Sequence, residues 1–317
     1  MSSAPLLAVR DLRVHFATEN TLVRAVDGVD FELRAGETLA LVGESGCGKS
    51  TLARALVGLN PVTSGSAQLA GRPLTGLSRS ALRPLRSELQ LIFQDPYSSL
   101  NPRFTIAETI GEALLLHDKA TRRTVDAKVC ELLAQVGLDT ELRARYPHEF
   151  SGGQRQRISI ARALAVEPRL LLCDEVTSAL DVSIQAQILD LLRSVQQRLG
   201  LSYLFITHDL GVVRYIAHRV AVMYVGQIVE LRETESLFES PAHPYTKALL
   251  SSIPRVSRGS GEPFSLAGEV PSPARPPSGC RFHPRCPQVF ERCPREMPEL
   301  YPVAAGLSRC FLNHSKE

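Results

Sequence analysis

Hydrophobic residues along this chain follow two spacings, and the change from one to the other predicts where strands give way to helices. Near the start, two segments alternate apolar with other residues: Leu12, Val14 and Phe16, then Val29, Phe31 and Leu33. Alternation with a period of two is typical of strands that bury one face. We therefore predict that an antiparallel lead-in sheet opens the chain.

Continuous apolar runs predict further strands that are buried on both faces, at residues 38–42, 169–173 and 201–206. Helical spacing follows the first run at Leu52, Leu56 and Leu59, and a long amphipathic helix is expected from Asp181 to Gly200. A short helix at 209–216 and a hairpin at 219–230 complete the pattern. Strands that alternate with helices in this way predict an α/β fold around a mostly parallel sheet.

A glycine-rich segment joins the first of these buried strands to its helix. Residues 43–50 read Gly-Glu-Ser-Gly-Cys-Gly-Lys-Ser and fit the pattern G-x-x-x-x-G-K-[ST], which wraps the phosphates of a nucleoside triphosphate. Backbone N–H groups and the helix N-terminus supply positive potential there. Lys49 would reach the β- and γ-phosphates, and the Ser50 hydroxyl would bind Mg²⁺. The candidate contacts are Gly43, Glu44, Ser45, Gly46, Cys47, Gly48, Lys49, Ser50 and Thr51.

The thiol within this loop has a steric interpretation. Only a small residue fits at Cys47, although a helix N-terminus could also lower the pKa of the thiol. A glycine-rich turn that binds nothing is the plain alternative for the whole segment. The strand, the helix, Lys49 and Ser50 together argue against it.

Two acidic residues follow the buried run at 169–173. A carboxylate at the end of such a strand is well placed to meet Mg²⁺ beside a phosphate loop, and Asp174 fits that role through a bridging water. Glu175 fits a general base that polarises the attacking water. Two acids at a strand end can also simply be solvated, but their combination with the loop at Gly43 favours the catalytic interpretation.

The composition of the chain limits the class of protein but does not point to a reaction. The 317 residues exceed the usual size of one domain, and the contents of 44% hydrophobic and 22% charged residues are ordinary for a soluble protein. A net charge of +3 and an aromatic content of 6% without tryptophan give little support for nucleic-acid binding. We find no signal peptide and no apolar run long enough to span a membrane, so we expect a cytoplasmic protein.

Proline and cysteine usage changes near the end of the chain. Of the 21 prolines, 11 lie between Ser251 and Glu317, and four of the seven cysteines lie there too. Proline cannot continue a helix or a central strand. We predict a first domain at 1–238, with a helical subdomain at about 95–165, and a loop-rich module at 239–317 that begins with a helical connector.

A second glycine cluster leads to a family. Residues 150–157 read Phe-Ser-Gly-Gly-Gln-Arg-Gln-Arg, where Ser151 alone would suggest a simple capped helix. The segment also precedes the Asp174–Glu175 pair in the sequence. In that position it resembles the signature of ATP-binding cassette (ABC) ATPases, with Phe150 in place of the usual leucine. Further elements of that family appear in order, at Gln94, residues 178–181 (Ser-Ala-Leu-Asp) and His208. The chain therefore resembles an ABC-type P-loop ATPase over residues 7–255.

The resemblance implies a site shared between two cassettes, with ATP between the phosphate loop of one and the signature of the other. One half-site would hold Lys49, Ser50, Gln94, Asp174, Glu175 and His208, with Phe16 stacked on adenine. The other half-site would be Ser151, Gly152, Gly153 and Gln154. His208 would contact the γ-phosphate, Gln94 would sense it, and Asp181 would bridge the dimer. ATP would close the pair and hydrolysis would reopen it.

Within the family, residues 85–103 and 243–254 resemble the F-type subunits of dipeptide and oligopeptide importers. This implies a homologous D-type cassette, two membrane permease subunits and an extracytoplasmic solute-binding protein as partners, at the cytoplasmic face of the inner membrane. Nickel or glutathione import stays open as an alternative. A nucleic-acid ATPase is disfavoured because no long coiled coil separates Ser50 from Ser151. A non-hydrolysing regulatory cassette is disfavoured because Glu175 and His208 are both present.

The four cysteines of the tail predict a metal centre. Cys280, Cys286, Cys293 and Cys310 have the spacing C-x₅-C-x₆-C-x₁₆-C in a stretch with little apolar core. Disulfides are disfavoured in the cytoplasm, and four thiolates suit either Zn²⁺ or an iron–sulfur cluster. The close cysteine pairs usual for zinc are missing, and similar tails of peptide importers imply a [4Fe–4S] cluster. We predict the cluster, with zinc as the alternative.

Overall fold

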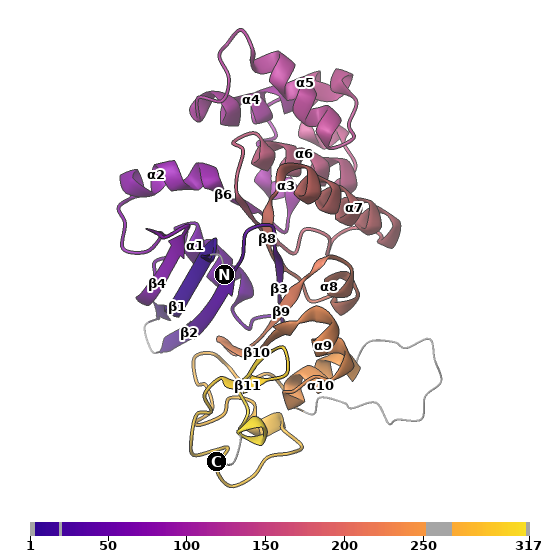
Figure 1. The fold of residues 1–317 in the computed structure, drawn as a ribbon. Coiled ribbons are helices and arrows are strands. Elements are labelled where there is room, and N and C mark those ends of the chain that lie inside the picture. Colours follow the sequence, from indigo (N-terminus) through magenta and orange to yellow (C-terminus); the bar gives the residue numbers. More distant parts are fainter. Residues whose placement is uncertain (1–3, 19–20, 252–267, 315–317) are drawn as a thin grey trace. The chain divides into compact units, whose positions relative to one another are not determined.

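The structure is a computed structural model that describes residues 4–18, 21–251 and 268–314. The chain divides into two compact units, whose elements are labelled in Figure 1. The first unit consists of Met1–Arg34, Thr38–Gly76 and Ile206–Glu317. The second consists of Ala35–Glu37 and Leu77–Phe205.

The first unit opens with a four-stranded antiparallel sheet in the order β2-β1-β4-β5. Its strands are β1 (Leu7–Ala17), β2 (Leu22–Leu33), β4 (Ser64–Leu69) and β5 (Arg72–Pro73). Alternate residues of β1 and β2 are buried, among them Leu12, Val14, Val29 and Phe31. The antiparallel lead-in sheet predicted from the alternation is therefore confirmed.

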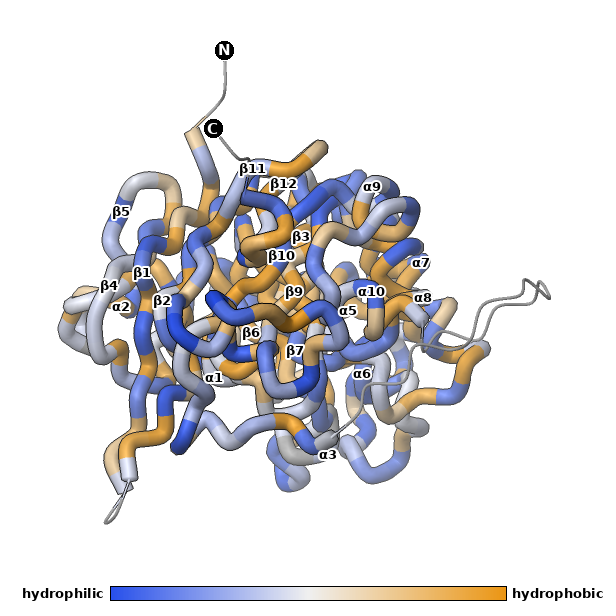
Figure 2. Tube along the Cα trace, turned by 90° about the horizontal axis from the view of Figure 1, so that it is seen from below, coloured by the Kyte–Doolittle hydropathy of each residue, from blue (hydrophilic) through white to orange (hydrophobic). Residues whose placement is uncertain are grey.

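A second set of strands in this unit has the order β11-β12-β10-β9-β3. Its members are β3 (Thr38–Val42), β9 (Arg219–Tyr224), β10 (Gln227–Glu233), β11 (Tyr301–Val303) and β12 (Gly306–Ser308). β3 runs parallel to β9, and β9 turns into β10 as the predicted hairpin. The hydrophobic character of β9 is visible in Figure 2. The proline-rich tail adds β12 to the edge of β10, a pairing that the sequence did not predict.

The described residues of the first unit form the α-helices α1 (Lys49–Leu56), α8 (Leu210–Ile216), α9 (Thr234–Glu239) and α10 (Pro244–Ser251). Single 3₁₀ turns lie at His283–Arg285 and Phe311–Asn313. The prediction that the first helix reaches Leu59 is wrong. Gly58 takes a φ of 71°, which ends the helix, and Leu59 is 54% exposed.

The second unit contains the strand order β8-β7-β6, with β6 parallel to β7. These strands are β6 (Leu89–Ile92), β7 (Leu170–Asp174) and β8 (Ser202–Ile206). Its helices are α2 (Arg79–Glu88), α3 (Pro96–Ser99), α4 (Ile106–Leu116), α5 (Val125–Gln135), α6 (Gly152–Leu164) and α7 (Val182–Leu199), with 3₁₀ turns at Thr140–Ala144 and Pro147–Glu149. Helices α3 to α6 occupy the region predicted to be helical. α7 ends where predicted, at Gly200 with a φ of 65°.

No helix in the described segments is both long enough and apolar enough to cross a membrane. The core of the first unit combines residues from its sheet with residues from the C-terminal tail. Val42, Val222 and Tyr224 pack in one cluster with Tyr245 of α10 and Phe282 of the tail. The Phe282 ring meets that of Tyr224 edge-on at 5.4 Å between centroids. The tail is thus part of this core, while the domain boundary at residues 238/239 stays a prediction.

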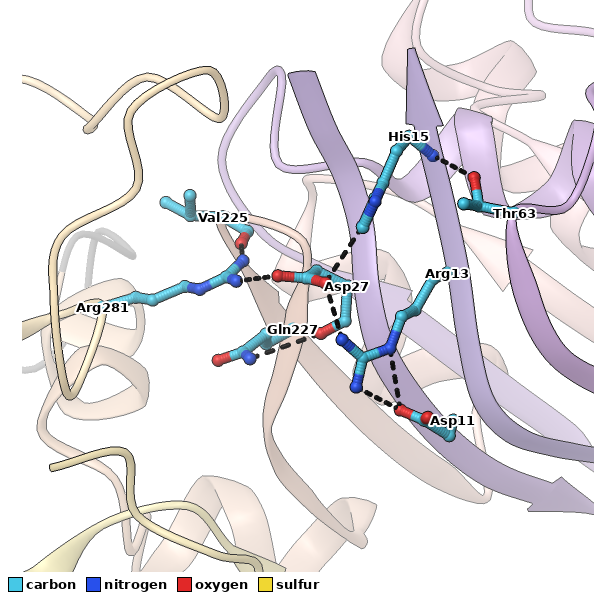
Figure 3. Close-up of polar contacts among 8 residues, drawn as sticks. All are labelled: Asp11, Arg13, His15, Asp27, Thr63, Val225, Gln227 and Arg281. Atoms are coloured by element: carbon cyan, nitrogen blue, oxygen red, sulfur yellow. Dashed lines mark hydrogen bonds and ion pairs between the residues drawn. The ribbon is translucent and has the colours of Figure 1, made fainter. Parts of the chain in front are cut away.

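A buried ion pair also ties the tail to β2 (Figure 3). Arg281 donates through Nη2 to the Asp27 carboxylate and through Nη1 to the carbonyl oxygen of Val225. Asp27 also meets His15 Nε2 at 3.0 Å and Arg13 Nη1 at 3.4 Å. Burial alone would raise the pKa of the Asp27 carboxyl, but the hydrogen bond and charge of Arg281, followed by His15, outweigh it and lower the pKa below 3.8.

The first prediction concerns this carboxylate. Asp27→Asn should lower the free energy of unfolding at pH 7 by about 3 kcal/mol, because it leaves Arg281 buried without its partner. A carboxyl with a lowered pKa in the folded state stabilises the protein above its unfolded pKa, and that contribution is lost as the pH falls through the folded pKa. The difference between the two proteins should therefore shrink below about pH 4.

Urea unfolding at several pH values measures both effects. Asp126→Asn is the matched control, because Asp126 pairs with Arg143 at the surface and is 67% exposed. That control should change the free energy of unfolding by less than about 1 kcal/mol. Equal losses in the two variants, or a difference that does not depend on pH, would contradict the account of Asp27.

Candidate functional site

The glycine-rich loop lies between β3 and α1 in the first unit, as predicted. Gly48 precedes α1 with a φ of 108°, and a Cβ placed on it would lie 2.0 Å from the carbonyl oxygen of Ala25. A side chain at this position would therefore need the backbone to move. The N-cap of α1 is Gly48 itself, which has no side chain that could cap the helix. This is the geometry of an anion-binding helix terminus.

Lys49 lies within the same loop, with only 5% of its surface exposed. Its Nζ donates to the carbonyl oxygens of Gly43 at 2.8 Å and Glu44 at 3.0 Å. These two bonds hold a positive charge at the mouth of the loop, where the helix terminus adds to the potential. Ser50 and Thr51 follow in the first turn of α1 and are half-buried, whereas Ser45 and Gly46 are exposed.

Cys47 is buried within the loop, and burial raises the pKa of its thiol, despite the opposing charge of Lys49. The expectation that the helix N-terminus lowers this pKa is wrong, because desolvation of the thiolate is the larger effect. The steric interpretation agrees with the packing. A Cβ on Gly43 would lie 2.9 Å from the Cys47 sulfur, so the thiol packs directly against the glycine backbone.

Two other candidate residues belong to the first unit. His208 follows β8 and is exposed, one residue before Asp209 caps α8 through its carboxylate. Phe16 lies on β1 opposite Val23 of β2 and is half-buried. A half-buried ring is accessible on part of its surface, as a stacking role would require.

The acidic candidates lie at the end of β7 in the second unit. Asp174 is the last residue of the strand and is 1% exposed. Glu175 follows with a φ of 49°, which is unusual for a side chain of this size. Its Oε2 accepts a hydrogen bond from Gln94 Nε2 at 2.8 Å. The structure therefore brings together two of the predicted catalytic residues, and strained backbone at such a position is characteristic of functional sites.

The signature segment opens α6 in the same unit. Ser151 and Gln154 form a capping box, in which each side chain bonds the backbone N–H of the other, at 3.4 and 3.0 Å. A Cβ on Gly153 would lie 2.5 Å from Ile184 of α7, so glycine permits this close helix contact. Ser151 and Gly152 stay exposed. Asp181 precedes α7, is exposed, and makes no side-chain cap there.

Known proteins are similar to this chain in sequence. The sequence matches the family described as "ABC transporter" over residues 26–178 and the family "Oligopeptide/dipeptide transporter, C-terminal region" over residues 229–293. A probable peptide ABC transporter ATP-binding protein of Sinorhizobium fredii is 51% identical over 96% of this chain and 89% of its own length. The chain belongs to the dipeptide and oligopeptide ABC transporter ATP-binding proteins. The di/tripeptide transport ATP-binding protein DppF of Pseudomonas aeruginosa is 50% identical, over 93% of this chain and 94% of that protein.

A solved structure agrees with the fold of this ABC ATPase subunit. The dimeric ATP-binding cassette MJ0796, bound to ADP and phosphate, has a TM-score of 0.66 and is 25% identical. The match covers 72% of this chain and 98% of that one. The predicted ABC-type α/β fold is therefore confirmed, whereas the cysteine module is not part of that confirmation.

The predicted metal centre finds no support in the structure. Among the described residues, which include all four tail cysteines, no three His, Cys, Asp or Glu side chains form a group that could hold a metal ion. Cys280 and Cys293 are joined only through the backbone, at 2.8 Å from N–H to carbonyl oxygen. Burial, followed by the nearby thiols of Cys310, Cys293 and Cys286, raises the pKa of Cys280 to about 11. The thiols are thus neighbours without forming a coordination site for one ion.

Sequence reasoning missed residues of the tail that contact the phosphate loop. The Glu44 N–H donates to the Tyr245 hydroxyl at 3.0 Å, and the Glu44 carboxylate pairs with Arg285. Glu44 and Arg285 are 241 positions apart. Neither the loop pattern nor the cysteine spacing indicates that contact. The only available signal is that Arg285 belongs to a tail segment that resembles the peptide-importer type.

The second prediction compares two glycines of the loop. Gly48→Ala should lower the free energy of unfolding by about 2 kcal/mol more than Gly46→Ala does, because only the first would overlap with backbone atoms. Gly46 has a φ of 79° and no atom within 4 Å of a Cβ placed on it. Gly46→Ala therefore has only the cost of placing an alanine in the left-handed backbone region. Thermal or urea unfolding of the two variants makes the comparison. Equal stability would contradict the close packing of the loop against Ala25.

Proposed function

We propose that this subunit binds Mg²⁺-ATP at the phosphate loop and hydrolyses it to drive the import of dipeptides or oligopeptides through separate membrane subunits. The observation that carries the proposal is the loop itself, where the buried Lys49 ammonium is held and α1 begins directly after the glycine N-cap. Both favour the negative charge of a polyphosphate. Mg²⁺ neutralises part of that charge when it is bound.

The chain offers a residue for each remaining task in the reaction. Ser50 would supply a hydroxyl and Asp174 a carboxylate to hold a bound Mg²⁺. Glu175 takes a proton from the attacking water as its oxygen bonds to the γ-phosphorus and ADP leaves. The hydrogen bond from Gln94 orients the Glu175 carboxylate, which ties the base to a residue that can sense the nucleotide. His208 contacts the γ-phosphate, and Phe16 stacks on adenine.

The site is completed by a second cassette. The N-terminus of α6 at Ser151, Gly152, Gly153 and Gln154, of which the first two are exposed, contacts in this proposal the nucleotide held by the phosphate loop of the partner. Asp181, exposed before α7, bridges the two cassettes. The dimeric state of the similar cassette MJ0796, bound to ADP and phosphate, supports this arrangement.

Peptides are the proposed cargo because the relatives are named for them and because the C-terminal region matches the oligopeptide/dipeptide transporter family. The proposed partners are a homologous D-type cassette, two permease subunits and, indirectly, a solute-binding protein, with this chain at the cytoplasmic face of the inner membrane. Nickel or glutathione is the alternative cargo. ATP hydrolysis by the reconstituted transporter should rise with peptide and solute-binding protein, and stimulation by nickel or glutathione alone would reverse the assignment.

The third prediction tests the general base. Glu175→Gln should keep Mg²⁺-ATP binding but lower the rate of hydrolysis by the reconstituted transporter by about 10²- to 10⁴-fold, because the amide cannot accept the proton. Glu167→Gln is the matched control. Glu167 also has a left-handed backbone, with a φ of 56°, but it pairs with Lys119 at the surface. Turnover of Glu175→Gln close to that of the control would contradict the role of Glu175.

The cysteine module carries a finer proposal. A single tetrahedral zinc ion needs its four sulfurs about 3.8 Å apart, given a Zn–S distance of about 2.3 Å. A group of that kind is absent from the described residues, which disfavours zinc. An iron–sulfur cluster binds each thiolate to a different iron and therefore tolerates wider spacing. The proposal of a cluster rests on the spacing of the four tail cysteines in the sequence and on the resemblance of the tail to those of peptide importers. Bound there, the cluster would brace the module.

The fourth prediction follows from that proposal. Protein purified without oxygen should be brown and contain about four irons per chain, as a cubane cluster requires. Cys286→Ser should abolish the colour, whereas Cys130→Ser, outside the tail, should retain it. Colourless protein without iron would contradict the cluster, and one zinc per chain would favour the alternative metal.

A further inference from the structure

Two residues from the C-terminal part of the chain hold Glu44, the second residue of the phosphate loop. Arg285 donates through Nη1 to Glu44 Oε2 at 2.8 Å and through Nη2 to Glu44 Oε1 at 3.1 Å. Tyr245 accepts the backbone N–H of Glu44 at 3.0 Å. Both the side chain and the backbone of this loop residue are therefore held by residues that follow β10 in the sequence.

This contact is built into the core of the first unit. Only 5% of the Arg285 side chain and 25% of the Glu44 side chain are exposed to solvent. The Tyr245 ring is fully buried and packs against Tyr224 at 4.6 Å and Phe282 at 5.4 Å between centroids. A paired guanidinium and carboxylate shielded from water make a stronger and more directional contact than a surface ion pair.

The tail segment that presents Arg285 is itself anchored at several points. Arg281 is buried against Asp27 and Val225 (Figure 3), and Phe282 lies in the apolar cluster. Arg285 ends the 3₁₀ turn at His283–Arg285, one residue before Cys286. Because the backbone on its N-terminal side is fixed, the guanidinium of Arg285 reaches Glu44 from a defined position.

The position of Glu44 in turn affects the residue that binds phosphate. Lys49 Nζ donates to the carbonyl oxygens of Gly43 and Glu44, so a shift of Glu44 moves an acceptor that orients the ammonium. The carboxylate of Glu44 also places a negative charge within the loop. Without a paired cation that charge would repel the phosphates of a nucleotide.

We propose that Arg285 is a positioning residue for nucleotide binding, which acts through Glu44 to hold the phosphate loop and to neutralise the carboxylate within it. The tail thereby contributes to ATP affinity without touching ATP. This inference rests on the proposed binding of Mg²⁺-ATP at the loop. A planar guanidinium with two parallel donors fits the role, whereas a lysine ammonium is a point charge without the planar pair of donors that matches a carboxylate.

The test is the dissociation constant of Mg²⁺-ATP for the full chain. Arg285→Ala should raise that constant by about tenfold, since it removes charge-assisted hydrogen bonds and leaves the carboxylate unpaired. Arg285→Lys should have a smaller effect. Arg295→Ala is the matched control, because Arg295 lies in the same module, pairs with Glu291 and is 71% exposed. Its constant should equal that of the unsubstituted chain.

A double-mutant cycle separates positioning from a general loss of stability. In the Glu44→Gln background, Arg285→Ala should raise the dissociation constant less than about twofold, because no carboxylate is left to neutralise. Equal effects of Arg285→Ala in both backgrounds, or no effect in the unsubstituted chain, would overturn the proposal. If Arg285→Ala fails to fold, Tyr245→Phe supplies the test: loss of one hydroxyl should weaken binding, and unchanged affinity would overturn it.

The failure of this inference differs from the failure of the proposed function. Lys49→Ala should abolish Mg²⁺-ATP binding if the loop is the nucleotide site. Binding that survives Lys49→Ala, or no binding by the unsubstituted chain, overturns the proposed site and with it the role of Arg285. Binding that is lost in Lys49→Ala but unaffected in Arg285→Ala overturns only the role of Arg285.

Discussion

The backbone conformation of the phosphate loop is the constraint around which the first unit is organised. Carbonyl groups of two strands, one from each strand set of this unit, approach the loop so closely that Gly43 and Gly48 have no room for a Cβ. These groups belong to Met223 of β9 and Ala25 of β2. Tyr245 and Arg285 reach the same loop from the C-terminal part. One short segment is therefore contacted by β2, by the hairpin strand β9, by α10 and by the tail. These contacts account for a tail that packs into the core of the unit.

The candidate residues are distributed over both units. The first unit carries the loop that suits phosphates, and the second carries Asp174, Glu175 and the helix that begins after Ser151. Gln94 is hydrogen-bonded to Glu175, so the residue proposed to sense nucleotide and the proposed base belong to the same unit.

The sequence sufficed for features that depend on neighbouring residues. Alternation at Leu12, Val14 and Phe16 predicted β1, and the glycine pattern with Lys49 predicted both the loop and its flanking elements. Helix ends were less certain, since Gly58 rather than the apolar spacing ended α1. Contacts between distant segments could not be predicted, because no local pattern couples Arg285 to Glu44 or β12 to β10. The direction in which the pKa of Cys47 shifts could not be read from the motif, because it depends on burial, which the motif does not determine.

The central claim is that one chain binds ATP but contributes only half of each hydrolytic site. The most direct test compares binding and hydrolysis by the purified chain at high dilution with the same measurements after a homologous cassette and the membrane subunits are added. We expect the dilute chain to bind Mg²⁺-ATP and to turn it over slowly, and turnover per chain to rise on assembly. Turnover by the dilute chain equal to that of the assembled transporter would contradict the account.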